Sequence, residues 1–297
     1  MVSPVSIEPE HVLWSGPRPN LNRPTLIAAF EGWNDAGDAA TTAAGHLAGR
    51  WGCKPVAEID PEPFFDFTAV RPTVHLDESK ARSIRWPVNE VRVAHLDDPG
   101  TDAVVLVGTE PQLRWRTFTH QLISLAGMLD VERIVTLGAL LAEVPHSRDV
   151  EVYGSTDDEE LRAELGLTPS TYEGPTGIVG VLSSACRDAG YRTASFWSAV
   201  PSYMPAAPSP KAALALVNRV SALMKAPVPT FDLEQRAKTY EREITRIVSE
   251  DEETAEYVAR LERAWDAGRD DDTDETSLSD DPDRLVAEVE KFLREGG

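Results

Sequence analysis

Short apolar runs recur along the chain, each flanked by a polar turn and a helix-forming segment. The first run is bounded by Pro24 and Gly32 and is followed by an alanine-rich stretch over residues 36–51. The four runs that follow this pattern are residues 25–30, 103–108, 133–138 and 194–200. Strands that alternate with helices of 10–15 residues are typical of βαβ units. The sequence therefore predicts an α/β protein with a mostly parallel sheet that is covered by helices.

Residues 54–100 interrupt this alternation. Short β-like segments follow one another here without helices between them, at residues 56–59, 73–76, 83–86 and 90–96. We interpret the region as an inserted β-hairpin or meander, a common site for contacts between subunits. It also carries Phe64, Phe65, Phe67 and Trp86, which a single chain would struggle to cover. The pattern predicts a homo-oligomer, with a trimer as the expected state.

The C-terminal part is expected to be a helical appendage. Pro227 and Pro229 end the α/β pattern, so we place a boundary between a core at residues 1–229 and an appendage at residues 230–297. Asp232 and Ser249 are expected to cap two amphipathic helices. The aspartate-rich stretch 267–283 is expected to be a disordered linker, and a short terminal helix is expected around residue 289. The helices must pack on something, and we expect them to form a lid over the strand-end loops.

The charge of the chain argues against several classes of partner. The net charge is −21, and residues 250–297 hold 18 acidic and 6 basic side chains. An acidic surface repels phosphate backbones, so nucleic acid is not an expected partner. No apolar run is long enough to span a membrane, and the first residues show no secretory signal. We expect a cytoplasmic protein in which Cys53 and Cys186 are buried, reduced thiols.

Polar side chains follow the predicted strands, where an open α/β sheet binds ligands. Asn34 and Asp35 come after the first strand, and either bind a ligand or cap the next helix. Glu110 and Arg114 follow the second strand, as an ion pair with each other or as ligand contacts. After the third strand come His146 and Arg148, suited to proton transfer, to binding an anion, or to ordinary polar contacts.

A glycine-rich turn at residues 172–180 leads into the next predicted helix and contains Thr176. Backbone N–H groups at a helix start can hold an anion; the alternative is a tight turn with close helix packing. The turn matches neither phosphate-binding glycine motif. No nucleophile elbow and no cluster of histidines with carboxylates stands out. We therefore predict no metal and no cofactor, and the catalytic residues, if there are any, stay unknown.

Five motifs in order resemble the proteasome assembly chaperone 2 family, over roughly residues 10–225. The resemblance is closest to an actinobacterial-like branch with a C-terminal helical extension. The motifs are FEGWNDAGDAA at residues 30–40, EPxxRW at 110–115, LGALL at 137–141 with PHSR at 145–148, YxGPTGI at 172–178 and PSY at 201–203.

The resemblance implies a three-layer α/β/α core similar to the purine nucleoside phosphorylase fold, often assembled as trimers or other homo-oligomers. It also implies a role in proteasome assembly, for which some relatives use a C-terminal hydrophobic-Tyr-X tail. This sequence ends in Arg294, Glu295 and two glycines, so docking by that route is not expected.

Two functions from different classes remain. The first is a non-enzymatic, homo-oligomeric assembly or scaffold protein that presents its acidic helices to a protein partner. The second is a binding protein or enzyme for an anionic or nucleoside-like small molecule. Its pocket would lie at the strand ends under the helical lid, formed by Asn34, Asp35, Glu110, Arg114, His146, Arg148 and Thr176.

Overall fold

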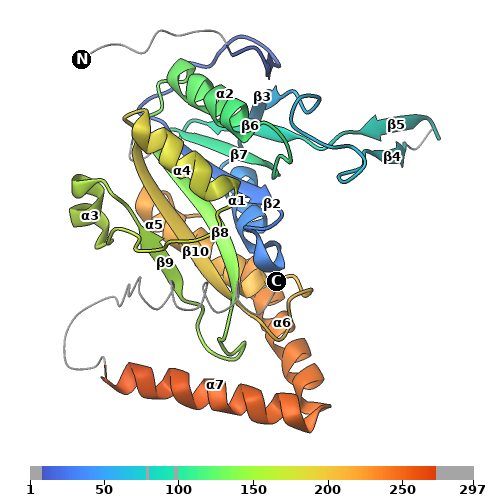
Figure 1. Cartoon of the computed structure of the whole chain (residues 1–297), viewed down its shortest axis with the longest axis vertical. Helices are drawn as coiled ribbons and strands as arrows, with labels where there is room; N and C mark the ends of the chain where they lie inside the picture. The colour runs from blue at the N-terminus through green and yellow to red at the C-terminus, as the bar shows by residue number, and fades with distance from the viewer. Residues whose placement is uncertain (1–8, 78–79, 97–99, 272–297) are drawn as a thin grey trace.

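The protein is organised around one mixed eight-stranded sheet (Figure 1). The structure is a computed structural model that describes residues 9–77, 80–96 and 100–271. In the order in which they pair, the strands are β1 (Val12–Trp14), β3 (Lys54–Ile59), β6 (Asn89–Ala94), β7 (Ala103–Thr109), β2 (Thr25–Glu31), β8 (Arg133–Ala142), β10 (Arg192–Pro201) and β9 (Val152–Ser155). The central strands β7, β2, β8 and β10 are parallel. The remaining strands pair antiparallel.

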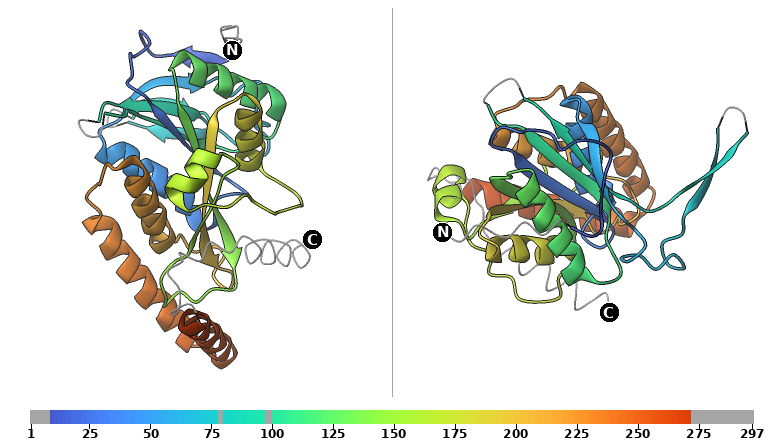
Figure 2. Two further views of the ribbon diagram at one scale, coloured as in Figure 1. Left: turned by 90° about the vertical axis from the view of Figure 1, so that its left-hand side faces the viewer. Right: turned by 90° about the horizontal axis from the view of Figure 1, so that it is seen from above.

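Helices cover both faces of the central strands. One face carries α1 (Ala39–Arg50) and α5 (Pro210–Met224), and the other carries α2 (Trp115–Met128) and α4 (Ile178–Asp188). The predicted α/β class and its three-layer arrangement are confirmed (Figures 1 and 2). A 3-10 turn (Ala36–Asp38) precedes α1, and α3 (Glu159–Leu165) follows β9.

The strand β2 shows why two helical layers are needed. Leu26, Ala28 and Phe30 are buried in the cluster that includes α2 and α4. Ile27 and Ala29 are buried in the cluster that includes α1 and α5. Side chains alternate between the two faces of a strand, so a continuous apolar run is stable only where both faces are covered.

Residues 54–100 do not form one inserted β region, as was predicted. β3 and β6 extend the main sheet, and only β4 (Thr73–Leu76) and β5 (Arg82–Arg85) form a separate two-stranded hairpin. The hairpin projects away from the body of the protein (Figure 2). The expectation that Phe64 and Phe65 are uncovered is wrong, because both are buried in the core beside α2. The side chain of Trp86 is 48% exposed.

Two long helices follow the α/β core. α6 (Phe231–Ser249) packs along α5, and Leu233 belongs to the core cluster of α1 and α5. Asp232 does not cap this helix; its carboxylate forms an ion pair with Arg50 of α1. α7 (Glu252–Asp271) begins three residues after the predicted cap at Ser249.

The predicted linker at residues 267–283 is partly helical, since its first five residues belong to α7. The rest of that linker and the expected terminal helix lie outside the described residues. The division into a core at 1–229 and an appendage at 230–297 stays a prediction.

Two further expectations concern the thiols and the membrane. Cys53 and Cys186 are unpaired and buried, as predicted. Burial raises the pKa of the Cys53 thiol to about 11 and that of Cys186 to about 12, so both are thiols near neutral pH. Among the residues that the structure describes, no helix has the length and apolar composition to cross a membrane.

A glycine on β8 fixes an aromatic side chain on β10. Gly138 and Trp197 are register partners, and a Cβ atom added at Gly138 would lie 2.4 Å from Cε3 of Trp197. That distance is far below any real contact, so the indole ring lies in the space that a side chain at position 138 would fill. The pair therefore sets the position of Trp197 on the sheet.

The substitution Gly138→Ala tests this packing. We expect it to lower the free energy of unfolding by about 1–3 kcal/mol, because the methyl group forces the indole ring to move. The measurement is urea denaturation. Gly45→Ala on α1 is the control, since a Cβ atom there would contact nothing within 4 Å, and it should be neutral or stabilising. Equal stability of Gly138→Ala and the wild type would contradict the close packing of Trp197 against Gly138.

Candidate functional site

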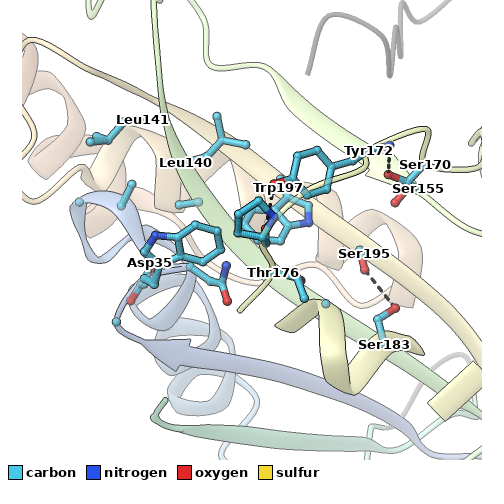
Figure 3. A pocket seen from close by; sticks show the side chains of 18 of the residues that line it. Asp35, Leu140, Leu141, Ser155, Ser170, Tyr172, Thr176, Ser183, Ser195 and Trp197 are labelled. Atoms are coloured by element: carbon cyan, nitrogen blue, oxygen red, sulfur yellow. Dashed lines mark hydrogen bonds between the residues drawn. The ribbon is translucent and has the colours of Figure 1, made fainter. Parts of the chain in front are cut away.

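A cavity of about 760 Å³ lies beside the carboxyl ends of β2 and β8. Its walls come from the loop after β2, from β8, β9 and β10, from α4 and the loop before it, and from the loop after β10. Figure 3 shows the side chains that line it. It lies where strand ends converge in α/β proteins, the usual place for a ligand site.

Asp35 lines this cavity, but its carboxylate is directed to the start of α1. Oδ1 accepts hydrogen bonds from the backbone N–H groups of Ala40 at 2.6 Å and Thr41 at 3.3 Å, and Oδ2 accepts one from the Thr41 hydroxyl. Burial raises the pKa of this carboxyl group to about 6, although these hydrogen bonds lower it. Of the two roles predicted for Asp35, the contacts favour capping of the helix.

Asn34 and Glu110 both bind the start of α4. The carboxylate of Glu110 accepts a hydrogen bond from the N–H of Ile178 at 2.8 Å, and Oδ1 of Asn34 lies 3.5 Å from the N–H of Val179. Gly177 allows this approach, since a Cβ atom there would lie 2.0 Å from Oδ1 of Asn34. A carboxylate near the N-terminus of a helix is favourable for the helix dipole. The glycine-rich turn is thus a tight helix start that already holds an acidic side chain.

The predicted site residues at this edge of the sheet do not all line the cavity. Thr176 lines the cavity with Asn34 and Asp35, whereas Glu110 and Arg114 do not. Arg114 is exposed and directly precedes α2. Of the two alternatives expected for Glu110 and Arg114, both of which are described, the ion pair with each other does not form, and the carboxylate of Glu110 binds the start of α4 instead.

His146 and Arg148 lie apart from the cavity, against the C-terminal helices. The His146 ring is within hydrogen-bonding distance of the hydroxyls of Tyr203 at 2.8 Å and Thr245 of α6 at 3.0 Å. Burial and the nearby Lys211 ammonium lower the pKa of His146. Arg148 binds both carboxylate oxygens of Asp266 on α7, at 2.8 and 2.9 Å. The two residues therefore connect the core to α6 and α7.

α6 and α7 do not form the predicted lid over the cavity. The cavity-lining residues among those described include none from α6 or α7. The helices cover His146, as expected, but the prediction that they shield Arg114 is wrong, because Arg114 is exposed. Glu110 is covered by the start of α4 instead.

Several cavity residues were not anticipated from the sequence. Thr193, Ser195 and Trp197 lie on one face of β10, and Ser183 and Ser184 lie on the facing side of α4. The alternation of polar and aromatic residues at positions 193, 195 and 197 could have indicated this face. Ser155 on β9 and Tyr172 in the loop before α4 complete the wall. Within the described ranges, no three histidine, cysteine or acidic residues are grouped to hold a metal ion.

The model of the PAC2 family matches residues 29–248. The chain belongs to the PAC2 family. The match begins within β2, covers β7, β8, β10, the cavity and α6 up to residue 248, and ends before α7. The resemblance to this family predicted from the motifs is therefore confirmed.

Solved structures agree with this assignment. A PAC2 family protein from Streptomyces avermitilis is 44% identical, with a TM-score of 0.74, over 79% of this chain and 99% of its own. A proteasome-assembly chaperone homologue from Mycobacterium tuberculosis is also 44% identical, with a TM-score of 0.71, over 79% of this chain and 99% of its own. A second M. tuberculosis protein, of unknown function, is 27% identical with a TM-score of 0.80, over 97% of this chain and 96% of its own. No curated protein matches the chain.

The buried carboxyl group of Asp35 predicts a specific pH dependence. Its pKa is about 6 in the folded protein against 3.8 when exposed. Between those values the folded state binds more protons than the unfolded state, so stability falls as the pH rises from 4 to 6. At 1.36 kcal/mol per pKa unit, Asp35 costs about 3 kcal/mol above pH 6. Asp35→Asn should remove this decrease, measured as the difference between the two denaturation profiles across pH.

Asp38→Asn is the matched comparison, because Asp38 is exposed in the same loop. Its charge is the smallest of the causes that raise the pKa of Asp35, so this substitution should leave most of the decrease in place. Parallel profiles of the wild type and Asp35→Asn would show that the Asp35 carboxyl is not destabilised by burial.

Proposed function

We propose that this PAC2 protein is a non-enzymatic, homo-oligomeric assembly protein whose partner is a component of the proteasome. The relative described as a proteasome-assembly chaperone homologue shares 44% of its residues with this chain over nearly its whole length, which supports the role. The expected oligomer is a trimer, and the expected location is the cytoplasm. The excess of acidic side chains in residues 250–297 would attract a basic surface of the protein partner.

The hairpin of β4 and β5 is the observation that carries this proposal. Val74 and Ile84 are directly opposite each other, and their side chains are 61% and 59% exposed. Leu76, two residues along β4 on the same face, is 62% exposed. Thr73, His75, Ser83 and Arg85 alternate with these residues and make the other face polar. The hairpin therefore has one mainly apolar face, with Arg82 opposite Leu76, and the part of the chain that the structure describes leaves this face exposed.

The base of the hairpin is held firmly in place. The rings of Phe67 and Trp86 pack edge to face, with centroids 4.7 Å apart. The carbonyl of Phe64 accepts hydrogen bonds from the N–H groups of Gln112 and Leu113, at 3.0 Å each. A lone two-stranded hairpin is marginally stable in water, so burial of its apolar face against a second subunit would stabilise it. A projecting, anchored apolar face is suited to subunit assembly.

The oligomer can be tested by charging this face. The double variant Val74→Asp and Ile84→Asp should reduce the mass of the particle in light scattering from that of an oligomer to that of a monomer. Its far-UV circular dichroism should not change, because both side chains are exposed. Leu113→Asp, at a residue that is 46% exposed outside the hairpin, should leave the mass unchanged. A wild-type monomer at micromolar concentration would contradict the proposal.

The partner can be tested with purified components. Mixed with isolated proteasome subunits, the full chain should form a complex that is resolved by size-exclusion chromatography and native mass spectrometry. It should also change the yield or rate at which those subunits assemble. Absence of both effects would contradict an assembly role, whatever the oligomeric state.

A further inference from the structure

The strand-end cavity is built from fixed elements, and its lining includes no residue of the hairpin that we propose for assembly. Its volume of about 760 Å³ falls in the range of roughly 300–1,000 Å³ that is usual for small-molecule sites. Trp197 is held against Gly138, and Asn34 is held against Gly177. Because both contacts leave no room for a Cβ atom, the walls are set before any ligand enters. Such a preformed cavity loses little entropy on binding.

Hydroxyl groups dominate the polar lining. Ser183, Ser184, Ser195 and Thr193 face the cavity from α4 and β10. The hydroxyl of Ser195 lies 2.7 Å from that of Thr136, buried beneath it, and 3.4 Å from that of Ser183 (Figure 3). A hydroxyl can donate one hydrogen bond and accept two. These side chains can therefore both donate hydrogen bonds to, and accept them from, a ligand that itself carries hydroxyl groups.

The charged groups of the cavity disfavour an anion. Among the described lining residues, three are aspartates, at positions 35, 38 and 157, and one is basic, Arg187. Arg187 already forms ion pairs with Asp157 at 2.7 Å and Asp188 at 3.3 Å. Arg114 and Arg148, which the sequence suggested for binding an anion, lie elsewhere. A negatively charged ligand would therefore meet uncompensated carboxylates.

Aromatic rings supply the remaining contacts. Trp197 and Tyr172 both line the cavity, and Figure 3 shows Trp197 between Asp35 and the pair of Ser183 and Ser195. The Tyr172 hydroxyl donates to the carbonyl of Pro175 at 2.8 Å, which orients the ring. Indole and phenol rings bury the flat, apolar faces of ring compounds, while polar groups at the rim bind their edges. Hydroxyl groups beside fixed aromatic rings match a ring that bears hydroxyl groups.

We propose that this cavity binds an uncharged ring compound with several hydroxyl groups, of the size of a nucleoside or a disaccharide. The apolar face of the ring stacks on Trp197, and its hydroxyl groups bond to the serines of α4 and β10. The site is separate from the hairpin, so this binding function is independent of assembly.

The test is a binding measurement on the full chain by saturation-transfer NMR and titration calorimetry. The probes are two nucleosides, adenosine and uridine, and two disaccharides, maltose and trehalose. Comparing the two pairs shows whether the cavity prefers a nucleoside or a sugar. Adenosine 5′-monophosphate and trehalose 6-phosphate are the charged counterparts, and spermidine represents a cation. We expect at least one neutral probe to bind with a Kd below about 1 mM, and its phosphorylated counterpart to bind at least tenfold more weakly.

Variants locate the binding. Ser183→Ala should lower the affinity for the probe about three- to tenfold, as expected for one lost hydrogen bond. Trp197→Leu, which removes the stacking ring, should weaken it more than tenfold. Ser249→Ala makes the same change as Ser183→Ala on the exposed end of α6 and should have no effect. Thermal denaturation shows whether each variant is folded.

Three outcomes would overturn the proposal. The first is that no neutral probe binds, and the second is that a phosphorylated probe or spermidine binds more tightly than every neutral probe. The third is that binding is unaffected by both Ser183→Ala and Trp197→Leu in variants that unfold at the wild-type temperature.

Discussion

The burial of the parallel strands on both faces is the constraint on which the rest of this structure depends. β7, β2, β8 and β10 pair along the centre of the sheet, and their side chains pack against α1 and α5 on one face and α2 and α4 on the other. Parallel strands with crossover helices bring their carboxyl ends to one edge. The loops after these strands therefore meet there, and the polar residues that follow each strand are brought to the same edge.

The lengths of the strands divide that edge into two regions. The loop after β2 pairs with β8 as far as Ala139, whose N–H donates to the carbonyl of Asn34 at 2.8 Å. β8 continues for three more residues, to Ala142, a distance of roughly 10 Å along a strand. The loop with His146 and Arg148 thus lies beyond the loop with Asn34 and Asp35. One region becomes the cavity beside α4. The other is filled by α6 and α7, where Lys211 donates to the carbonyl of His146 at 2.8 Å and also binds Glu241 of α6 at 2.7 Å.

The two surfaces to which we assign functions, the hairpin and the cavity, lie on opposite sides of the strand order. The hairpin is inserted between β3 and β6, on the side of the sheet that ends in β1, whereas the cavity is formed by β8, β10 and β9 at the other end. Subunit contacts at the hairpin would therefore leave the cavity open. A protein of this architecture can assemble through one end of its sheet and bind a small molecule at the other.

The sequence by itself determined the positions of the main strands and helices, because their signals are local. Apolar runs such as residues 25–30 and 103–108 coincide with β2 and β7 almost residue for residue, and five ordered motifs indicated the PAC2 family. Of the seven residues that the sequence suggested for one pocket, Asn34, Asp35 and Thr176 line the cavity. The short elements β1, β9 and α3 were missed, since three to seven residues carry little periodicity.

The tertiary structure alone decided which polar groups meet. That Glu110 binds the start of α4 instead of Arg114 depends on how α4 packs over β2, β8 and β10. That Phe64 and Phe65 are buried depends on α2 lying above them. The serines that face the cavity come from α4 and from the strand that follows it, β10, and show no charge or motif. Contacts of this kind follow from strand order and strand length, which are set by packing the whole sheet and leave no local trace in the sequence.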